Sequence, residues 1–225
     1  SHGFYYEPKL NRWEWQRARC LQTVEDLYTQ SFVLPYLVPM LENAGANVLL
    51  PRERDCQTAE IIIDNDGCLN TNSTYTEHTA DKVWRQGTGK GFAHLRPQYI
   101  DFENPFKEGT FRIAETVKKG KESTAEWIPE IPQNGQYAVY VSYQTVPNSS
   151  DDALYTVYHK GGVSQFKVNQ KMGGGTWVYL GTFGFDAGKS NACKVTLSNR
   201  SAKAGQTVTA DAVKIGGGMG NIARR

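Results

Sequence analysis

Three tryptophans, Trp84, Trp127 and Trp177, could bind a sugar, because an aromatic ring can stack on the apolar face of a pyranose. Trp127 and Trp177 lie in stretches of alternating residue type, which favours burial in a β-sheet core. Trp84 stands close to the glycine-rich residues 87–91, so we expect it to be more open to solvent. The tryptophans and the 12 tyrosines are therefore candidates for a sugar platform, but their pattern defines no single site.

The cysteines and one glycine-rich segment carry weaker signals. Cys20, Cys56, Cys68 and Cys193 lack the CxxC spacing of zinc ribbons and redox sites. Cys56 and Cys68 flank an apparent strand and turn, so a disulfide and two free thiols are equal alternatives. Residues 87–91 (GTGKG) lack the spacing of a phosphate-binding loop and no helix follows them, so we predict a turn.

Composition sets broad limits on the fold and its partners. Aromatic residues make up 12% of the 225 residues, and the enrichment in Tyr, Trp, Thr and Val favours β-structure. The formal net charge of +2 argues against a nucleic-acid-binding protein. No apolar run reaches the 18 residues of a transmembrane helix, so we predict no transmembrane segment.

The N-terminal part of the sequence mixes helical and strand patterns. An apolar stripe at three- and four-residue spacing predicts a helix up to about Thr29 and a second one ending near Ala44. Pro35 and Pro39 interrupt the stripe, and Gly45 stands where a C-cap glycine is expected. Residues 48–50 and 61–63 are short apolar runs that resemble buried parallel strands. The succession of helix, glycine and buried strand is typical of an α/β segment.

From about residue 81 the pattern becomes entirely β. Residues 137–143 show a two-residue period, in which Tyr137, Val139, Val141 and Tyr143 alternate with Ala138, Tyr140 and Ser142. Strand-like runs follow at 154–159, 165–170, 177–185, 194–198 and 207–215. Lys160 and the two glycines after it predict a hairpin between the second and third runs. Short strands at this spacing indicate an antiparallel sandwich or jelly roll. Its predicted core residues are Trp127, Tyr137, Val139, Val141, Phe166, Val168, Trp177, Val195, Leu197 and Val213.

Five short motifs follow one another in this β-rich part. They are AEWIP at 125–129, NGQYAVYV at 134–141, VNQ at 168–170, GGTWVYLG at 174–181 and ADAV at 210–213. Their order and spacing over residues 80–216 resemble the golvesin and xanthan-lyase carbohydrate-binding-like domain. The resemblance implies a β-sandwich attached to a secreted enzyme or adhesive protein, with a polysaccharide as its partner.

A second set of motifs lies near the N-terminus: SHG at 1–3, VEDL at 24–27, LENAGA at 41–46 and VLLPRERD at 48–55. It resembles the start of a zinc-dependent N-acetylmuramoyl-L-alanine amidase, although Ser1 stands where that family has glycine. The resemblance implies that His2 and Glu25 (or Asp26, if the alignment shifts by one residue) are zinc ligands and that zinc activates a water. The family's remaining ligand and general base are missing here. We therefore expect zinc only in a complete parent protein, and no catalytic residue in this chain.

These observations predict a mainly β protein. An antiparallel, jelly-roll-like β-sandwich is expected at 79–216, after a partial amidase-like α/β segment at 1–78 and before a glycine-rich hinge or tail at 217–225. The expected role is binding or positioning of peptidoglycan within a secreted, periplasmic or cell-surface bacterial amidase. The alternatives are a carbohydrate-binding accessory module of a polysaccharide-degrading enzyme, such as a xanthan-lyase-like protein, and a spacer that binds no ligand.

Overall fold

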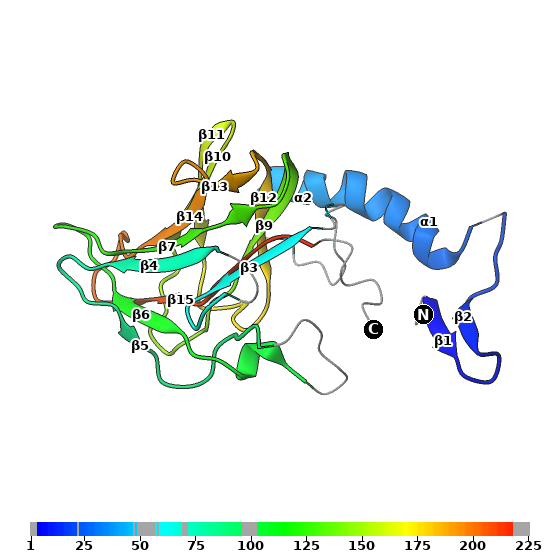
Figure 1. Ribbon diagram of the computed structural model, residues 1–225, viewed down its shortest axis with the longest axis horizontal. Helices are drawn as coiled ribbons and strands as arrows, with labels where there is room; N and C mark the ends of the chain where they lie inside the picture. Colours follow the sequence, from blue (N-terminus) through cyan, green and yellow to red (C-terminus); the bar gives the residue numbers. More distant parts are fainter. Residues whose placement is uncertain are drawn as a thin grey trace. The chain divides into compact units, whose positions relative to one another are not determined.

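The computed structural model describes residues 4–21, 23–46, 48, 57, 59–68, 72–95 and 103–217. The chain forms two compact units, Ser1–Pro51 and Arg52–Arg225. Figure 1 draws the first unit in blue and the strands of the second from cyan to red. The division lies well ahead of the boundary predicted near residue 78.

The first unit contains one hairpin and one continuous helical stretch. Strand β1 (Phe4–Glu7) pairs antiparallel with β2 (Arg12–Trp15). The helical stretch is formed by α1 (Glu25–Phe32), the π-helical turn η1 (Val33–Leu37) and α2 (Val38–Asn43). None of the described helices is long and apolar enough to cross a membrane.

Pro35 and Pro39 do not divide this stretch into two separate helices, as the sequence predicted. Pro35 lies in the π-helical turn, where the N–H of Val38 donates to the carbonyl oxygen of Val33. The wider π-helical turn accommodates Pro35, which has no N–H to donate to a helical hydrogen bond. Gly45 has a φ of +87° just after α2, which confirms the predicted C-cap. The strand predicted at 48–50 falls mostly outside the described residues.

The regular elements in the described part of the second unit are strands, apart from one short 3-10 helix. Their bounds are β3 (Glu60–Asp64), β4 (Thr74–His78), β5 (Arg85–Gln86), β6 (Arg112–Glu115), β7 (Thr124–Ile128), β8 (Glu130–Ile131), β9 (Gly135–Val141), β10 (Ala153–His159), β11 (Gly162–Val168), β12 (Val178–Phe185), β13 (Gly188–Lys189), β14 (Lys194–Ser198), β15 (Thr207–Ala210) and β16 (Ala212–Gly216), with a short 3-10 helix, η2 (Pro105–Lys107), between β5 and β6.

Two antiparallel sheets make the predicted sandwich. One has the strand order β11-β10-β14-β7-β4 and the other the order β12-β9-β16-β3. Smaller sheets, β13-β8 and β15-β6-β5, complete the unit. The predicted hairpin is also present, since β10 and β11 pair from His159 and Gly162 onward, with two residues between them.

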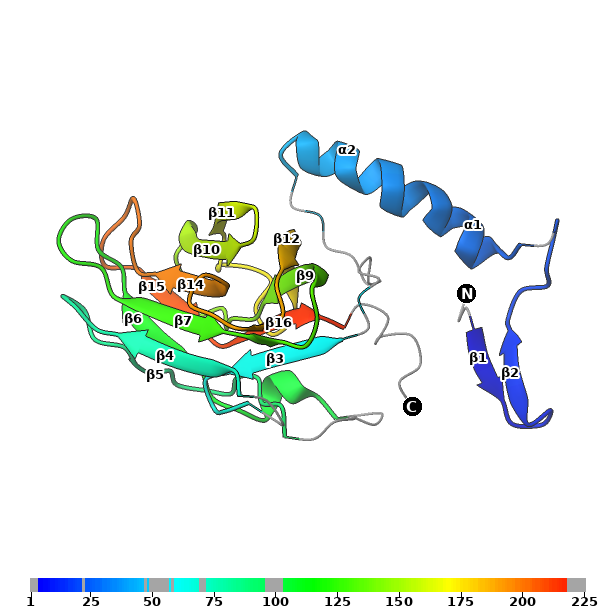
Figure 2. The same ribbon diagram turned by 45° about the horizontal axis from the view of Figure 1, so that its top comes forward.

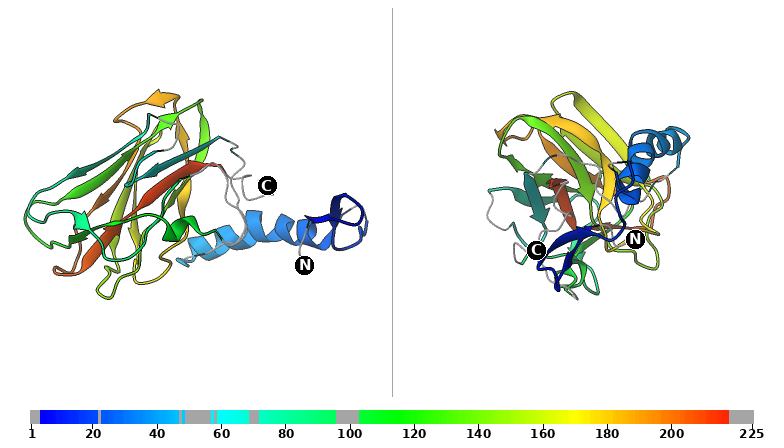
Figure 3. Two further views of the ribbon diagram at one scale, coloured as in Figure 1. Left: turned by 60° about the horizontal axis from the view of Figure 1, so that its bottom comes forward. Right: turned by 90° about the vertical axis from the view of Figure 1, so that its right-hand side faces the viewer.

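Strands β3 and β4 belong to the sandwich and not to an α/β segment. Strand β3 pairs antiparallel with β16, placing Ile63 opposite Val213, and β4 pairs with β7. Figures 2 and 3 show β3 running beside β16. Ile61 and Ile63 face the main core while Ile62 packs in a second apolar cluster. Because both faces of β3 are covered, its sequence lacks alternation and resembles a buried parallel strand.

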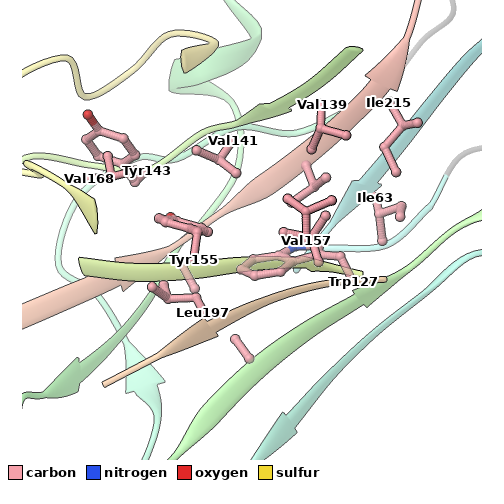
Figure 4. Close-up of a cluster of buried hydrophobic side chains, with 14 of the residues drawn as sticks. Ile63, Trp127, Val139, Val141, Tyr143, Tyr155, Val157, Val168, Leu197 and Ile215 are labelled. Atoms are coloured by element: carbon pink, nitrogen blue, oxygen red, sulfur yellow. The ribbon is translucent and has the colours of Figure 1, made fainter. Parts of the chain in front are cut away.

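The core lies between the two large sheets. Figure 4 shows Val139, Ile63 and Ile215 of one sheet reaching toward Trp127 and Val157 of the other. The predicted core residues are buried, except Phe166 and Trp177, which stay partly exposed. Trp177 differs from the prediction because it precedes β12 and does not lie within it. The period-two alternation therefore places the inward-facing side chains correctly wherever the strand is regular.

Candidate functional site

The two predicted zinc ligands do not define a site in the described part of the chain. His2 lies outside the described residues. Glu25 is the exposed first residue of α1, and its Oε2 lies 3.4 Å from Nε of Arg17. Among the described residues, no three His, Cys, Asp or Glu side chains are grouped so that they could hold a metal ion.

The described cysteines are free thiols. Cys20 is exposed, Cys68 is partly buried and Cys193 is buried. Burial raises the pKa of the Cys68 thiol, which makes it a poorer nucleophile at neutral pH. Cys56 lies outside the described residues.

One described serine and histidine are hydrogen bonded, as in a nucleophilic pair. His159 Nε2 lies 3.0 Å from Ser164 Oγ, but His159 Nδ1 accepts the N–H of Gly161 at 3.2 Å. A neutral imidazole that accepts at Nδ1 carries its proton on Nε2, so His159 donates to Ser164. It cannot then remove the serine proton, and the pair supports the hairpin between β10 and β11.

Two of the three tryptophans, Trp84 and Trp177, lie in environments that differ from the predicted ones. Trp127 is fully buried, as expected. Trp84 is only 3% exposed, although the glycine-rich segment after it suggested an open position. A Cβ on Gly87 would collide with the ring of Phe111, so this glycine allows close packing and does not mark an exposed loop. Trp177, predicted as core, is the partly exposed one.

A row of side chains crosses the outer face of the four-stranded sheet near Trp177. Tyr179 of β12 pairs with Tyr140 of β9, Tyr140 with Lys214 of β16, and Lys214 with Ile62 of β3. Their neighbours along the strands, such as Val139, face the core. Because successive residues of a strand point to opposite faces, the row lies on the outside of the sandwich.

Aromatic rings and one ammonium group gather on this row. The rings of Tyr140 and Tyr179 are 5.5 Å apart between centroids. Nζ of Lys214 lies 4.4 Å from the centroid of Tyr140 and 5.8 Å from that of Trp177. Lys214 is only 3% exposed and Tyr140 5%, while Trp177 and Tyr179 remain partly exposed. Cation–π attraction strengthens in such a desolvated setting, so it helps to fix the rings.

Two phenylalanines from a separate segment also contact the ring of Trp177. Its ring centroid lies 4.9 Å from that of Phe92 and 5.5 Å from that of Phe106. The side chain of Asn104 caps η2 by accepting the N–H of Phe106 at 3.0 Å. We call Tyr140, Trp177, Tyr179 and Lys214, with Phe92 and Phe106, the aromatic face.

Two buried carboxyl groups lie at the edge of the aromatic face. Asp211 accepts the N–H of Phe92, with 3.1 Å to each of its oxygens. Burial raises the pKa of Asp211 to about 7, and burial together with the charges of Asp211 and Asp66 raises that of Asp64 to about 8. Asp64 lies opposite Ala212 on β16 and is 1% exposed. The segment that carries Phe92 is thus anchored to a group that titrates near neutral pH.

Comparison with known proteins identifies the domain. Residues 105–217 match the family model described as "Golvesin C-terminal domain". The chain belongs to this family. Over 96 residues it is 33% identical to xanthan lyase of Bacillus sp. (strain GL1), covering 43% of this chain and 10% of that enzyme. The structure of a Paenibacillus xanthan lyase is similar with a TM-score of 0.51 at 25% identity, covering 70% of this chain and 13% of the lyase.

The chain therefore spans about a tenth of the curated relative that it matches. Within the chain, the sandwich is larger than the family match. Strands β3 and β4 precede residue 105, yet they complete the two main sheets by pairing with β16 and β7. The golvesin-type fold of this chain thus includes strands that the family match leaves out.

Proposed function

We propose that this chain is a polysaccharide-binding accessory module of a secreted polysaccharide-degrading enzyme. The aromatic face is the observation that carries the proposal, because it presents the partly exposed rings of Trp177 and Tyr179 on a rigid sheet. Membership of the golvesin C-terminal domain family and the similarity to two proteins named xanthan lyase support it. The proposal follows the alternative that the sequence analysis gave, an accessory module of a polysaccharide-degrading enzyme. It does not follow the role within an amidase.

The rings suit a sugar because they are held in place before any ligand arrives. Trp177 packs against Phe92 and Phe106, and Tyr179 against Tyr140. Preorganised rings lose little conformational entropy when a ligand binds. A pyranose can stack on the open ring faces, while the Tyr179 hydroxyl, 2.8 Å from that of Thr182, can exchange hydrogen bonds with sugar hydroxyls.

The amidase-like interpretation of the first unit remains a prediction from the sequence, together with its zinc and its peptidoglycan substrate. Glu25 belongs to that prediction, and in the structure its carboxylate forms an ion pair with Arg17. Sugar binding by the second unit requires neither Glu25 nor Arg17.

Affinity electrophoresis of the full chain tests the proposal. Migration is compared in gels that contain xanthan, dextran or no polysaccharide. We expect xanthan to retard the wild-type chain and Trp177→Ala to reduce the retardation at least fivefold, because the stacking ring is lost. Met172→Ala is the matched control, since Met172 is a 60% exposed apolar side chain in the same loop but has no ring. Equal retardation of a folded Trp177→Ala variant and the wild type would refute the role of the aromatic face.

A further inference from the structure

Trp177 directly follows a glycine-rich loop that joins β11 to β12. The loop comprises residues 169–176, between the end of β11 at Val168 and Trp177, and we call it the glycine loop. Gly173 and Gly175 have φ values of +75° and +73°, in the left-handed region that favours glycine. Glycine also loses more conformational freedom on folding than any other residue. Contacts from elsewhere are therefore needed to order this loop.

Tyr143, in the segment after β9, contacts the glycine loop at its beginning, its middle and its end. The Tyr143 hydroxyl donates to the carbonyl oxygen of Met172 at 2.7 Å and lies 3.4 Å from that of Asn169. The carbonyl oxygen of Tyr143 accepts the N–H of Gly175 at 2.9 Å. A single residue thus binds the loop through both its side chain and its main chain.

These contacts lie on both sides of Trp177 in the chain. Val178, the residue after it, is the first residue of β12 to pair with β9. Gly175, two residues before it, is bonded to Tyr143. A Cβ on Gly173 would lie 3.0 Å from the Tyr143 hydroxyl oxygen and 3.7 Å from the side chain of Val178, so the loop folds back against both. The main chain on either side of Trp177 is therefore fixed relative to β9.

Tyr143 is itself firmly held. It is 2% exposed and belongs to the main core. Figure 4 shows its ring beside Val168, with the hydroxyl oxygen directed away from the other core side chains. Burial raises the pKa of Tyr143 to about 12, so the hydroxyl keeps its proton and can donate at neutral pH. Tyr143 thus connects the rigid core to the loop that precedes Trp177.

A second anchor holds the beginning of the glycine loop and does not involve Tyr143. The fully buried side chain of Gln170 donates to the carbonyl oxygen of Thr209 at 2.8 Å and accepts its N–H at 2.9 Å. The hydroxyl of Thr145 donates to the carbonyl oxygen of Gln170 at 2.9 Å. Loss of the Tyr143 hydroxyl should therefore leave the fold intact and loosen only the part of the loop nearer to Trp177.

We propose that Tyr143 is a positioning residue for polysaccharide binding. Its hydroxyl holds the glycine loop against the segment after β9, which keeps the Trp177 ring in place for stacking. This inference rests on the proposed function and adds a buried residue that acts through Trp177. A ring that must first be ordered loses part of its binding free energy to conformational entropy. Loss of the hydroxyl should therefore weaken binding even though the stacking ring is still present.

Tyr143→Phe tests the inference in the full chain, because it removes the hydroxyl and keeps the buried ring. Tyr137→Phe is the matched control, since Tyr137 is a fully buried tyrosine of β9 whose hydroxyl donates to the carbonyl oxygen of Gln133 at 2.8 Å. Affinity electrophoresis over a range of xanthan concentrations gives the Kd. We expect it to rise about three- to tenfold in Tyr143→Phe and to stay within about twofold of the wild type in Tyr137→Phe.

NMR of the ligand-free chain supplies a readout that does not depend on binding. In Tyr143→Phe the indole N–H signal of Trp177 and the amide signals of residues 171–176 should shift or broaden, while those of β10 stay as in the wild type. An unchanged Trp177 signal or a wild-type Kd in Tyr143→Phe would overturn the inference. An equal rise of the Kd in Tyr137→Phe would overturn it as well, because general destabilisation would then explain both variants.

The inference and the proposed function fail in different ways. If the wild type does not bind xanthan, or if folded Trp177→Ala binds as well as the wild type, the proposed function fails and the inference falls with it. If Trp177→Ala loses binding while Tyr143→Phe keeps the wild-type Kd, only the inference fails.

Discussion

The two sheets of the sandwich share one core but carry different chemistry on their outer faces. The four-stranded sheet holds Tyr140 and Lys214, both almost fully buried, beneath rings that include Trp177. The five-stranded sheet holds Thr156 and Thr196, whose side-chain hydroxyls form no hydrogen bond within the described part of the chain. Folding requires only that one side of each sheet be apolar. The outward side chains are therefore free to differ between the sheets, and function is best sought there.

Trp127→Ala should have the largest effect, because it removes the support common to both faces. The Trp127 ring contacts Tyr155 and Tyr75 at centroid distances of 6.4 and 5.4 Å, and its Nε1 donates to the carbonyl oxygen of Asp211 at 3.2 Å. We expect the free energy of unfolding to fall by about 3–5 kcal/mol. Urea unfolding followed by circular dichroism measures it.

The control for this variant is Val163→Ala, a 58% exposed position on edge strand β11, which should change stability by about 0.5 kcal/mol or less. A loss below about 1 kcal/mol for Trp127→Ala would show that the two sheets do not depend on a single core.

The second-largest effect is a dependence of the free energy of unfolding on pH. It arises from two aspartates at the edge of the aromatic face, Asp64 and Asp211. The pKa values of Asp64 and Asp211 are raised to about 8 and about 7 in the folded chain, while an unfolded aspartate titrates near 4. Between these values the folded state binds more protons than the unfolded state, so the free energy of unfolding must fall as pH rises. We expect a fall of at least about 1.4 kcal/mol between pH 5 and pH 8, the equivalent of one pKa unit.

Asp64→Asn tests the origin of this slope, because the amide stays neutral at every pH. The variant should lose a large part of the difference between pH 5 and pH 8. Glu108→Gln, at a surface turn after η2, serves as the matched control and should keep the wild-type slope. An unchanged slope in Asp64→Asn would assign the pH dependence to other groups.

The sequence predicted the core far better than the outer faces. Alternation along β9 identifies Val139 and Val141 as inward residues, because burial is a property of each strand by itself. The aromatic face depends on which strands are neighbours, since Lys214 meets Tyr140 only through the β9–β16 pairing. Strand order is set by long-range contacts that no local pattern encodes.

The outward row of polar side chains on the five-stranded sheet, which runs from Thr76 to Gln165, escaped the sequence analysis for the same reason. Thr76 and Gln165 stand 89 positions apart in the numbering and lie on opposite edge strands of one sheet. The local signal in each strand was only a polar residue at an outward position.

The errors at Trp84 and Trp177 have different origins. Trp177 precedes the strand to which its alternating pattern assigns it, since β12 begins at Val178. For Trp84, the nearby glycines wrongly indicate exposure. At Gly87 the glycine instead allows the close approach of the Phe111 ring.

A smaller effect should follow from removing the charge of Glu126 on the outer face of the five-stranded sheet. Glu126→Gln breaks the ion pair with Lys194. The side chain of Glu126 is 16% exposed and that of Lys194 is 19% exposed. Ion pairs near the surface contribute modestly, so we expect a loss of about 0.5–1 kcal/mol that shrinks in high salt. Unfolding at low and high sodium chloride concentration measures it. A loss that does not depend on salt would indicate a role other than charge pairing.

The smallest effect is expected for the two central threonines on the outer face of the five-stranded sheet. Thr156→Val with Thr196→Val keeps the side-chain shape and the β-branched form that strands favour. Since neither hydroxyl has a described partner, the free energy of unfolding should change by about 0.5 kcal/mol or less. Thr116→Val is the matched control, because the Thr116 hydroxyl donates to the carbonyl oxygen of Lys203 at 2.7 Å and accepts the N–H of Gln206 at 2.9 Å. That fully buried position should lose about 1–3 kcal/mol. A comparable loss in the double variant would mean that the two hydroxyls stabilise the sheet.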